Sequence, residues 1–391
     1  MIYIFSVLLC FSLVIYYDVL GNSNSRVTAY RWLLVWFILL SGLQYMVGTD
    51  IPVYVDEYQR LSTKFLTWNN ITDYHVRYQP GWMLLCYFCR IFTNEYTLLK
   101  MIQAIFLNVA IFTFFKKHTK YIFTAVFVYA ISDYLVLNFN VMRQSIALGF
   151  GLYAITALKA SDWKRYGLYT FLGYMFHNSA LLLLALPLIK FFKPNKFALA
   201  TIFLLFGVIV IGISRLDLAM IFQEILFSGY VDEGIAEVGR GYMNGDRLGV
   251  QDNFSIFSLT RLFYFIAVTY YLVKYKETFW GMFGLIYVLI LIISGFLPIL
   301  WRYRLYVDIP FFIMLTQVII DLSQNRRFAN NTKIFATCLM LTFITYLSTK
   351  DLFYKGKSEP YAAIDQYHPY HSIFNPKMNT DQLNYFESLS N

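Results

Sequence analysis

The chain has 391 residues, of which 58% are hydrophobic and only 14% are charged, and its formal net charge is +9. A mean hydropathy of +0.52 excludes an ordinary soluble domain of this size, because no soluble core needs so much apolar surface. The excess of Lys and Arg is therefore assigned to the basic cytoplasmic loops of a membrane protein, and nucleic acid is not expected as a partner.

Apolar runs of about 17–20 residues recur along the chain and predict membrane-spanning helices, since continuous apolar runs suit helices and alternating ones suit barrel strands. The first run lacks a basic head and a small-residue cleavage site, so we expect a retained span and not a cleaved signal. The expected full-length spans cover residues 2–20, 29–47, 98–115, 121–137, 146–158, 197–213, 256–273, 281–300, 305–320 and 334–347.

Two further apolar segments do not fit a single crossing. Residues 81–92 are too few to span the bilayer and predict a re-entrant or interfacial helix on the outer side. Residues 166–192 are too many, and His177, Asn178 and Ser179 interrupt them. We expect two short helices that turn near His177, because this keeps both basic flanks inside, whereas one long tilted crossing is the alternative.

The basic residues between the runs set the expected topology. Lys-rich loops mark the cytoplasmic side, which leaves two long polar segments, 50–80 and 214–255, on the outer side. The prediction is an all-α integral membrane protein, a polytopic bundle of about twelve transmembrane helices with short or re-entrant outer helices and both termini outside. Residues 1–349 form the membrane domain, and residues 350–391 form an extracytoplasmic tail.

Polar residues that this topology places on the outer face are the candidate site. Most outer cations are arginines, whose planar fork suits bidentate binding of phosphate or carboxylate, whereas the cytoplasmic ones are mostly lysines. No P-loop, Gly-rich dinucleotide motif or metal-ligand cluster is present, so no cofactor and no metal is expected. The candidates are Asp50, Arg143, Gln144, His177, Asn178, Arg240, Arg247, Arg302 and Arg304.

Each candidate also has a purely structural interpretation. Arg143, expected at the head of a helix, can snorkel to the membrane boundary. Arg302 and Arg304 can anchor the interface beside aromatic neighbours, and the two arginines of the large loop can pair with loop carboxylates. His177 can satisfy a backbone carbonyl in a turn, and Asp50 can cap a helix.

Several short motifs occur along the chain in the same order as in a known family, which the chain therefore resembles. They are V-G-T-D at 47–50 followed by Tyr54 and Tyr58, Y-Q-P-G-W at 78–82, N-V-M-R-Q-S-I-A at 140–147, F-H-N-S-A at 176–180, W-R-Y-R-L-Y-V-D-I-P at 301–310 and P-Y-H-S-I-F at 369–374. From about Val47 onward the chain resembles the EpsG family of Wzy-like bacterial polysaccharide polymerases. One departure is Gln79, which stands where an E-P-G sequence would place a carboxylate.

The resemblance implies a membrane glycosyltransferase that assembles capsule, O-antigen or exopolysaccharide on the outer face of the bacterial cytoplasmic membrane. Its substrate would be an oligosaccharide on undecaprenyl diphosphate, within the lipid bilayer, and a chain-length regulator is a further candidate partner. The arginines, Arg143 first, would stabilise the departing diphosphate. His177 or Asp50 would be the base, while Gln144 and Asn178 would hydrogen-bond sugar or phosphate.

Three other functions remain open at this point. A flippase or exporter of lipid-linked saccharide would also use cationic residues, but along a path open to both faces. A lipid-donor glycosyltransferase or O-antigen ligase would share the outer arginines and use another acceptor. A membrane acyltransferase would use His177 but would not explain so many arginines. Charged residues are scarce inside the spans, which favours an enzyme that works from one side.

Overall fold

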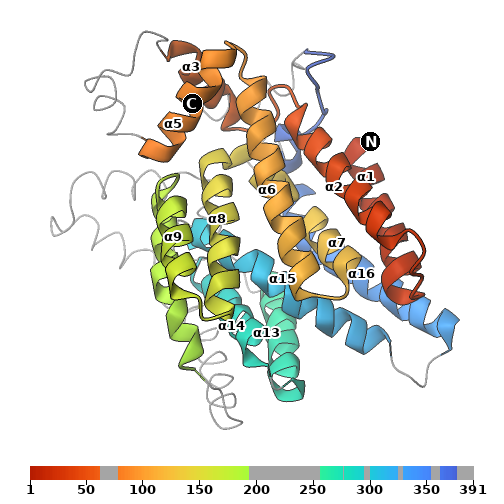
Figure 1. Ribbon diagram of the computed structural model, residues 1–391. Helices are drawn as coiled ribbons and strands as arrows, with labels where there is room; N and C mark the ends of the chain where they lie inside the picture. The colour runs from red at the N-terminus through yellow and green to blue at the C-terminus, as the bar shows by residue number, and fades with distance from the viewer. Residues whose placement is uncertain are drawn as a thin grey trace. The chain divides into compact units, whose positions relative to one another are not determined.

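A computed structural model describes residues 1–61, 78–192, 256–275, 277–294, 300–324, 329–353 and 362–376. The regular secondary structure of these residues is helical, and their extended pairing is limited to isolated bridges at Gln44–Ser372 and Ser372–Asn375 (Figure 1). The predicted all-α class is therefore confirmed.

Four helical segments in the described part of the chain are long and apolar enough to cross a membrane. They are Ile2–Val19, Thr97–His118, Trp301–Ser323 and Asn330–Phe353. Shorter apolar helices accompany them. The chain is thus an all-helical membrane protein, and the count of twelve crossings stays a prediction. The expected span at 197–213 lies outside the described residues.

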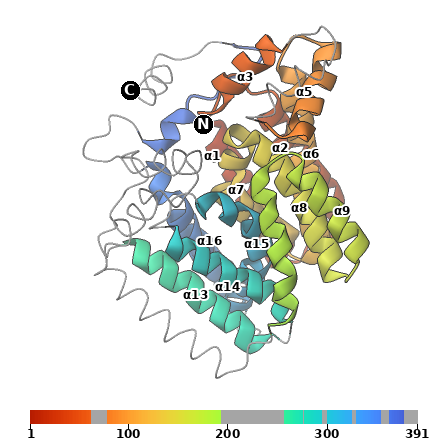
Figure 2. The same ribbon diagram turned by 90° about the vertical axis from the view of Figure 1, so that its left-hand side faces the viewer.

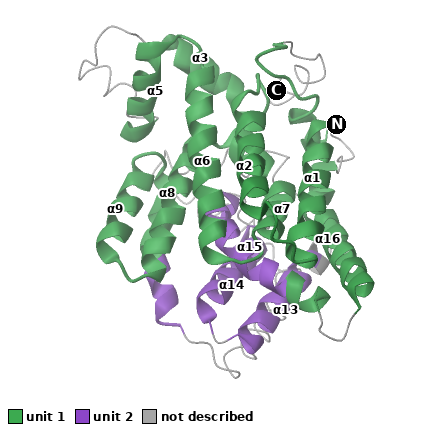
Figure 3. Ribbon diagram, turned by 45° about the vertical axis from the view of Figure 1, so that its right-hand side comes forward, with its two compact units in different colours: residues 1–185, 319–391 green, residues 186–318 purple. Residues whose placement is uncertain are grey.

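The chain divides into two compact units (Figure 3). One comprises Met1–Ala185 and Ile319–Asn391, and the other comprises Leu186–Val318. The helices of the first unit are α1 (Ile2–Leu13), α2 (Arg26–Gly42), α3 (Ile51–Arg60), α5 (Pro80–Phe92), α6 (Thr97–His118), α7 (Ile122–Ser132), α8 (Met142–Lys159), α9 (Trp163–Tyr174) and α16 (Asn330–Phe353). The second unit contains α13 (Ile256–Lys274), α14 (Thr278–Ile293) and most of α15 (Trp301–Ser323).

Two predictions about short helices are confirmed. The segment expected to be too short to span forms α5. The interrupted segment breaks as predicted, because α9 ends at Tyr174 and a 3₁₀ helix, Asn178–Lys190, follows. The hydroxyl of Tyr166 donates to the main-chain oxygen of Leu183, which it can reach only if the chain doubles back after α9.

Other boundaries differ from prediction. The expected span 121–137 is divided, because α7 ends at Ser132 and a separate π-helical turn covers Val136–Asn140. The polar segment 50–80 does not begin as a loop but as helix α3, and its residues 62–77 lie outside the described part. Arg302 and Arg304, expected in an outer loop, lie in the first turn of α15.

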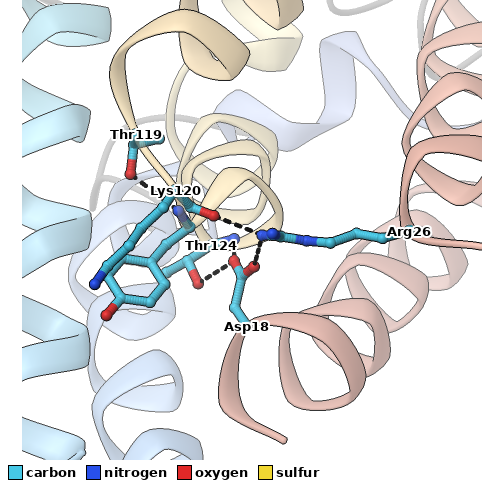
Figure 4. A network of polar contacts seen from close by, with 6 residues as sticks. Asp18, Arg26, Thr119, Lys120 and Thr124 are labelled. Atoms are coloured by element: carbon cyan, nitrogen blue, oxygen red, sulfur yellow. Dashed lines mark hydrogen bonds and ion pairs between the residues drawn. The ribbon is translucent and has the colours of Figure 1, made fainter. Parts of the chain in front are cut away.

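Within the first unit the helices pack as neighbouring pairs. Helix α6 contacts α2 on one side and α8 on another, α8 contacts α9, and α7 contacts α1 and α16 (Figures 1 and 2). A buried carboxylate joins α2 and α7 to the π-helical segment Val14–Val19, which follows α1. Asp18 Oδ1 accepts from Arg26 at 2.8 Å, while its Oδ2 accepts the N–H and the hydroxyl of Thr124 at 2.8 and 2.9 Å (Figure 4). This contact satisfies the N–H of Thr124, one of the N-terminal donors of α7 that have no partner within the helix.

A second polar network explains why the chain leaves helix α7 early. Asn138, fully buried in the π-helical turn, donates to the Tyr129 hydroxyl at 2.7 Å and to the Tyr134 carbonyl at 3.0 Å. It also accepts from Asn108 of α6 at 2.8 Å. Lys100 of α6, 1% exposed, donates to the main-chain oxygen of Asn138. The turn is therefore tied to α6 directly before α8 begins.

Candidate functional site

Two motifs far apart in the sequence meet a C-terminal segment at the head of α8. The V-G-T-D loop approaches the Asn140 turn so closely that the backbone N–H of Thr49 donates to Asn140 Oδ1 at 3.2 Å. Asn140 in turn donates to Gln366 and to the hydroxyl of Tyr367, each at 2.8 Å. The N–H of Gly48 donates to the carbonyl of Gln366 at 3.1 Å. The C-terminal segment thereby holds the loop before α3 against the turn before α8.

A pocket opens between α3 and α5, which lie near the N-terminal end of α6 (Figure 1). Its walls include Tyr54 and Glu57 from α3, Tyr78, and Trp82 from α5. The rings of Tyr54 and Trp82 lie 5.5 Å apart at 57°. The hydroxyl of Tyr78 donates to Glu57 Oε2. The pocket is thus an aromatic enclosure with a carboxylate in its wall.

The fold of α3 follows from its sequence. Ile51, Tyr54 and Tyr58 are buried at the spacing of one helical face, and a proline lies in the first turn. Burial raises the pKa of Tyr58 to about 12, so its hydroxyl stays protonated and donates to the carbonyl of Thr93 at 2.9 Å. This bond fixes α3 to the end of α5.

Arg143 lies at the head of α8, as the sequence predicts, and contacts the tyrosines of the pocket. Its guanidinium carbon is 4.3 Å from the ring centroid of Tyr78 and 5.9 Å from that of Tyr54, and its Nε donates to the Tyr54 hydroxyl at 3.4 Å. Among the described residues it forms no ion pair with a carboxylate. Stacking on aromatic faces orients the guanidinium without neutralising its charge.

The F-H-N-S-A loop lies beside the same pocket wall. The N–H of Gly81 donates to the carbonyl of Met175 at 2.7 Å, and Phe176 packs against the cluster that contains Tyr54 and Trp82. His177 Nδ1 accepts the N–H of Ser179 at 3.1 Å, so the neutral imidazole carries its proton on Nε2. This arrangement supports the turn, and a role as base needs the other tautomer. Its neighbour Asn178 is exposed.

The remaining candidates of the first unit have different surroundings. Asp50 is the residue before α3, yet its side chain makes no capping hydrogen bond. The Thr49 hydroxyl approaches its carboxylate at 3.5 Å. Gln144 follows Arg143 on α8 and is 1% exposed, so it lies in the helix packing and not on the surface. The catalytic and binding roles expected of both residues stay predictions.

The arginines of the second unit are not brought into this site by any described contact. Arg304 pairs with Asp308 at 3.2 Å, and that carboxylate is 1% exposed. Arg304 also lies 5.8 Å from the ring centroid of Tyr287, and Arg302 lies 5.8 Å from that of Trp301. The pairing with Asp308 is a partner that the sequence analysis did not consider. Arg240 and Arg247 lie outside the described residues.

The sequence analysis did not single out Glu57 and the aromatic side chains that line this pocket. The signal was present in two forms. Tyr54, Tyr58, Tyr78 and Trp82 all belong to motifs that carried the family resemblance. The apolar positions of α3 also recur at helical spacing, which places Glu57 one turn from Tyr54 on the same side.

The fold and the site define a class of protein. It is an all-helical membrane protein in which a cation, a carboxylate and aromatic side chains lie together at one end of the first unit. The chain belongs to the EpsG family, whose model matches residues 27–370. Membership indicates a polymerase of polysaccharide biosynthesis that acts on a lipid-linked saccharide. No curated protein sequence matches the chain. No solved structure matches it either.

Proposed function

We propose that this protein polymerises capsular, O-antigen or exopolysaccharide repeat units on the outer face of the bacterial cytoplasmic membrane. It transfers a glycan from undecaprenyl diphosphate to the end of another lipid-linked repeat unit. The family supports the polymerase activity, and the site supports a substrate that carries a strong anion. Neither the family nor the site specifies the lipid carrier or the outward orientation, and the experiment tests these two parts of the proposal.

The observation that carries this proposal is the environment of Arg143. Its partners among the described residues are two tyrosines, so its charge is not neutralised by a carboxylate. Its position in the first turn of α8 adds the positive end of the helix dipole. When the glycosidic bond breaks, negative charge develops on the diphosphate, and a preorganised guanidinium stabilises that charge.

The roles of the other residues follow as parts of the same proposal. His177 or Asp50 takes the acceptor proton, and Gln144 and Asn178 hydrogen-bond sugar or phosphate. Arg302 and Arg304 from α15, with Arg240 and Arg247, supply further cations to the diphosphate. Of these, Arg304 has the weakest support, because Asp308 already pairs with it.

The test is complementation of a strain that lacks the gene, with lipid-linked glycans sized on a gel. Arg143→Lys keeps the charge but loses the fork, and we expect polymerisation to fall roughly tenfold or more. Arg90→Lys is the matched control, because Arg90 also stacks on a tyrosine, 5.5 Å from the Tyr58 centroid, yet donates to the main-chain carbonyls of Asn94 and Gln59.

Three outcomes separate the candidate functions. Single repeat units in the Arg143→Lys strain, with a normal ladder in the Arg90→Lys strain and equal membrane levels, support a polymerase. Loss of every outward-exposed unit indicates a flippase. An unchanged ladder with Arg143→Lys returns this residue to the role of a membrane anchor. His177→Ala is tested in parallel, and an intact ladder there assigns His177 to the turn alone.

A further inference from the structure

We infer that the C-terminal segment, residues 362–376, positions Arg143 for the transfer reaction, and that it acts through the side chains of Asn140 and Tyr367. This inference rests on the proposed function, in which Arg143 stabilises the departing diphosphate. It also gives a role to the P-Y-H-S-I-F motif at 369–374, which lies in this segment and has no part in the proposed reaction.

The C-terminal segment is fixed to the end of α2 by hydrogen bonds of its own. The backbone N–H of Tyr45 donates to the carbonyl of His371 at 2.9 Å. The Tyr370 hydroxyl donates to the carbonyl of Leu40 at 3.0 Å. These bonds pair main-chain groups at and just after the C-terminal end of α2, where the helix itself offers no partner. The segment is therefore anchored before it reaches the site.

Two buried side chains of this segment hold the amide of Asn140. Gln366 is 8% exposed and Tyr367 is 1% exposed. Asn140 Nδ2 donates to Gln366 Oε1 and to the Tyr367 hydroxyl, each at 2.8 Å. Its Oδ1 accepts the N–H of Thr49 at 3.2 Å. Both N–H groups and the oxygen of the amide are thus in use, so the amide cannot rotate without losing hydrogen bonds.

The same segment fixes the starts of both helices that meet at Arg143. The N–H of Gly48 donates to the carbonyl of Gln366 at 3.1 Å, and α3 begins three residues after Gly48. Helix α8 begins two residues after Asn140. Tyr54 lies in the first turn of α3, and its hydroxyl accepts from Nε of Arg143, in the first turn of α8, at 3.4 Å. The C-terminal segment therefore sets the distance between these two helix starts.

The turn before α8 has a second, independent attachment. Asn138 accepts from Asn108 of α6 at 2.8 Å. Because this attachment remains, we expect loss of the Asn140 contacts to shift the head of α8 and not to unfold it. Such a shift moves the guanidinium of Arg143. Stabilisation of developing charge depends on preorganised geometry, and a misplacement of about 1 Å can lower a rate roughly a hundredfold.

The experiment uses the full chain in lipid nanodiscs and the lipid-linked repeat unit extracted from a strain that lacks the gene. Tyr367→Phe keeps the ring, which packs against Phe139 at a centroid distance of 6.1 Å, and removes the oxygen that accepts from Asn140. We expect kcat for joining repeat units to fall about tenfold. KM should change much less, because the charge of Arg143 stays near the bound diphosphate.

Tyr370→Phe is the matched control. It removes a hydroxyl from the same segment, but the bond of that hydroxyl to the Leu40 carbonyl holds α2 and not the turn before α8. We expect the two variants to have similar melting temperatures, because each loses one tyrosine hydroxyl. The kcat of Tyr370→Phe should stay at the wild-type value.

Combination with Arg143→Lys separates positioning from general destabilisation. If Tyr367 acts through Arg143, Tyr367→Phe has no further effect once the guanidinium is gone, and the double variant has the kcat of Arg143→Lys. A purely structural role would lower kcat by the same factor in both backgrounds, as independent sites do. Asn140→Ala, which removes all three side-chain bonds, should lower kcat more than Tyr367→Phe. If Asn140→Ala does not fold, Tyr367→Phe alone decides.

The outcomes distinguish this inference from the proposed function. If the wild-type protein joins repeat units while Tyr367→Phe and Tyr370→Phe have the same kcat, the C-terminal segment does not position Arg143 and the polymerase activity still stands. The same conclusion follows if Tyr367→Phe lowers kcat by an equal factor with and without Arg143→Lys. If the wild-type protein joins no repeat units, the proposed function fails and this inference fails with it.

Discussion

Gly48→Ala is the sharpest test of how the site is held together. Gly48 has φ +101°, outside the conformations that residues with a side chain readily adopt, and this strain costs roughly 1–3 kcal/mol. The new Cβ would lie 2.2 Å from the main-chain oxygen of Phe139, which cannot turn aside as a flexible side chain would. Overpacking adds roughly 1–3 kcal/mol, so the expected destabilisation is about 2–6 kcal/mol.

Two other glycines provide matched controls. Gly21 also has a positive φ, +70°, but a Cβ there meets nothing within 4 Å, so Gly21→Ala carries strain without a clash. Gly167 lies within α9 with open space around it, and Gly167→Ala is expected to stabilise the helix by about 0.5–1 kcal/mol. Thermal melting of the detergent-purified protein, followed by tryptophan fluorescence, should rank Gly167→Ala highest and Gly48→Ala lowest.

The same variant tests the link to function. The clash pushes the V-G-T-D loop away from the Asn140 turn, three residues before Arg143. We therefore expect a shorter glycan ladder in Gly48→Ala cells at temperatures where the protein is still folded. If Gly48→Ala melts together with Gly21→Ala and its ladder is normal, the close approach of loop and turn does not position Arg143, and the reasoning fails.

Three substitutions test the other buried contacts. Asp18→Asn weakens the pairing with Arg26 and should lower the free energy of unfolding by about 1–3 kcal/mol in a melting experiment. An unchanged melting temperature would mean that this ion pair makes no net contribution to stability. Asn138→Leu removes three hydrogen bonds at a buried position, at roughly 1–3 kcal/mol for each group left unsatisfied, and should reduce the monodisperse fraction in size-exclusion chromatography. Arg304→Ala removes the ion-pair partner of the buried Asp308, at up to about 3–5 kcal/mol, and membrane levels should recover when Asp308→Asn is added.

The sequence predicts helices well wherever a long apolar run is the dominant signal. The expected span 98–115 corresponds to α6, and the expected 334–347 lies within α16. The run 121–137 fails because its break depends on tertiary contacts. Asn138 directly follows this run in the sequence, and nothing local shows that Asn108 and Tyr129 will bond to it. Hydropathy measures composition, whereas the break follows from which partners lie alongside.

The candidate site likewise has features that the sequence could predict and features that depend on tertiary contacts. Arg143 could be placed at the head of a helix because an apolar run begins directly after it. The carboxylate partner of Arg304 could also have been read, since Asp308 follows at the i,i+4 spacing of one helical face. Glu57 could not be ranked above the other polar-segment carboxylates, because its neighbours Tyr78 and Trp82 lie 21 and 25 residues further along the chain. Only their packing around one space makes Glu57 distinctive.

Ion pairing distinguishes Arg143 from Arg304, which the sequence alone could not rank. Arg304 faces a carboxylate on its own helix that is 1% exposed, so removing the arginine would leave a buried negative charge without its ion-pair partner. The charge of Arg304 is already paired with Asp308, so a diphosphate would have to compete with that carboxylate for the guanidinium. Arg143 faces two tyrosines, which hold its plane in place and leave its charge available. Of these two arginines, Arg143 is therefore the better placed to bind an anion, because its described partners are aromatic rings and not a carboxylate. Under the proposed function, that anion is the diphosphate of the donor.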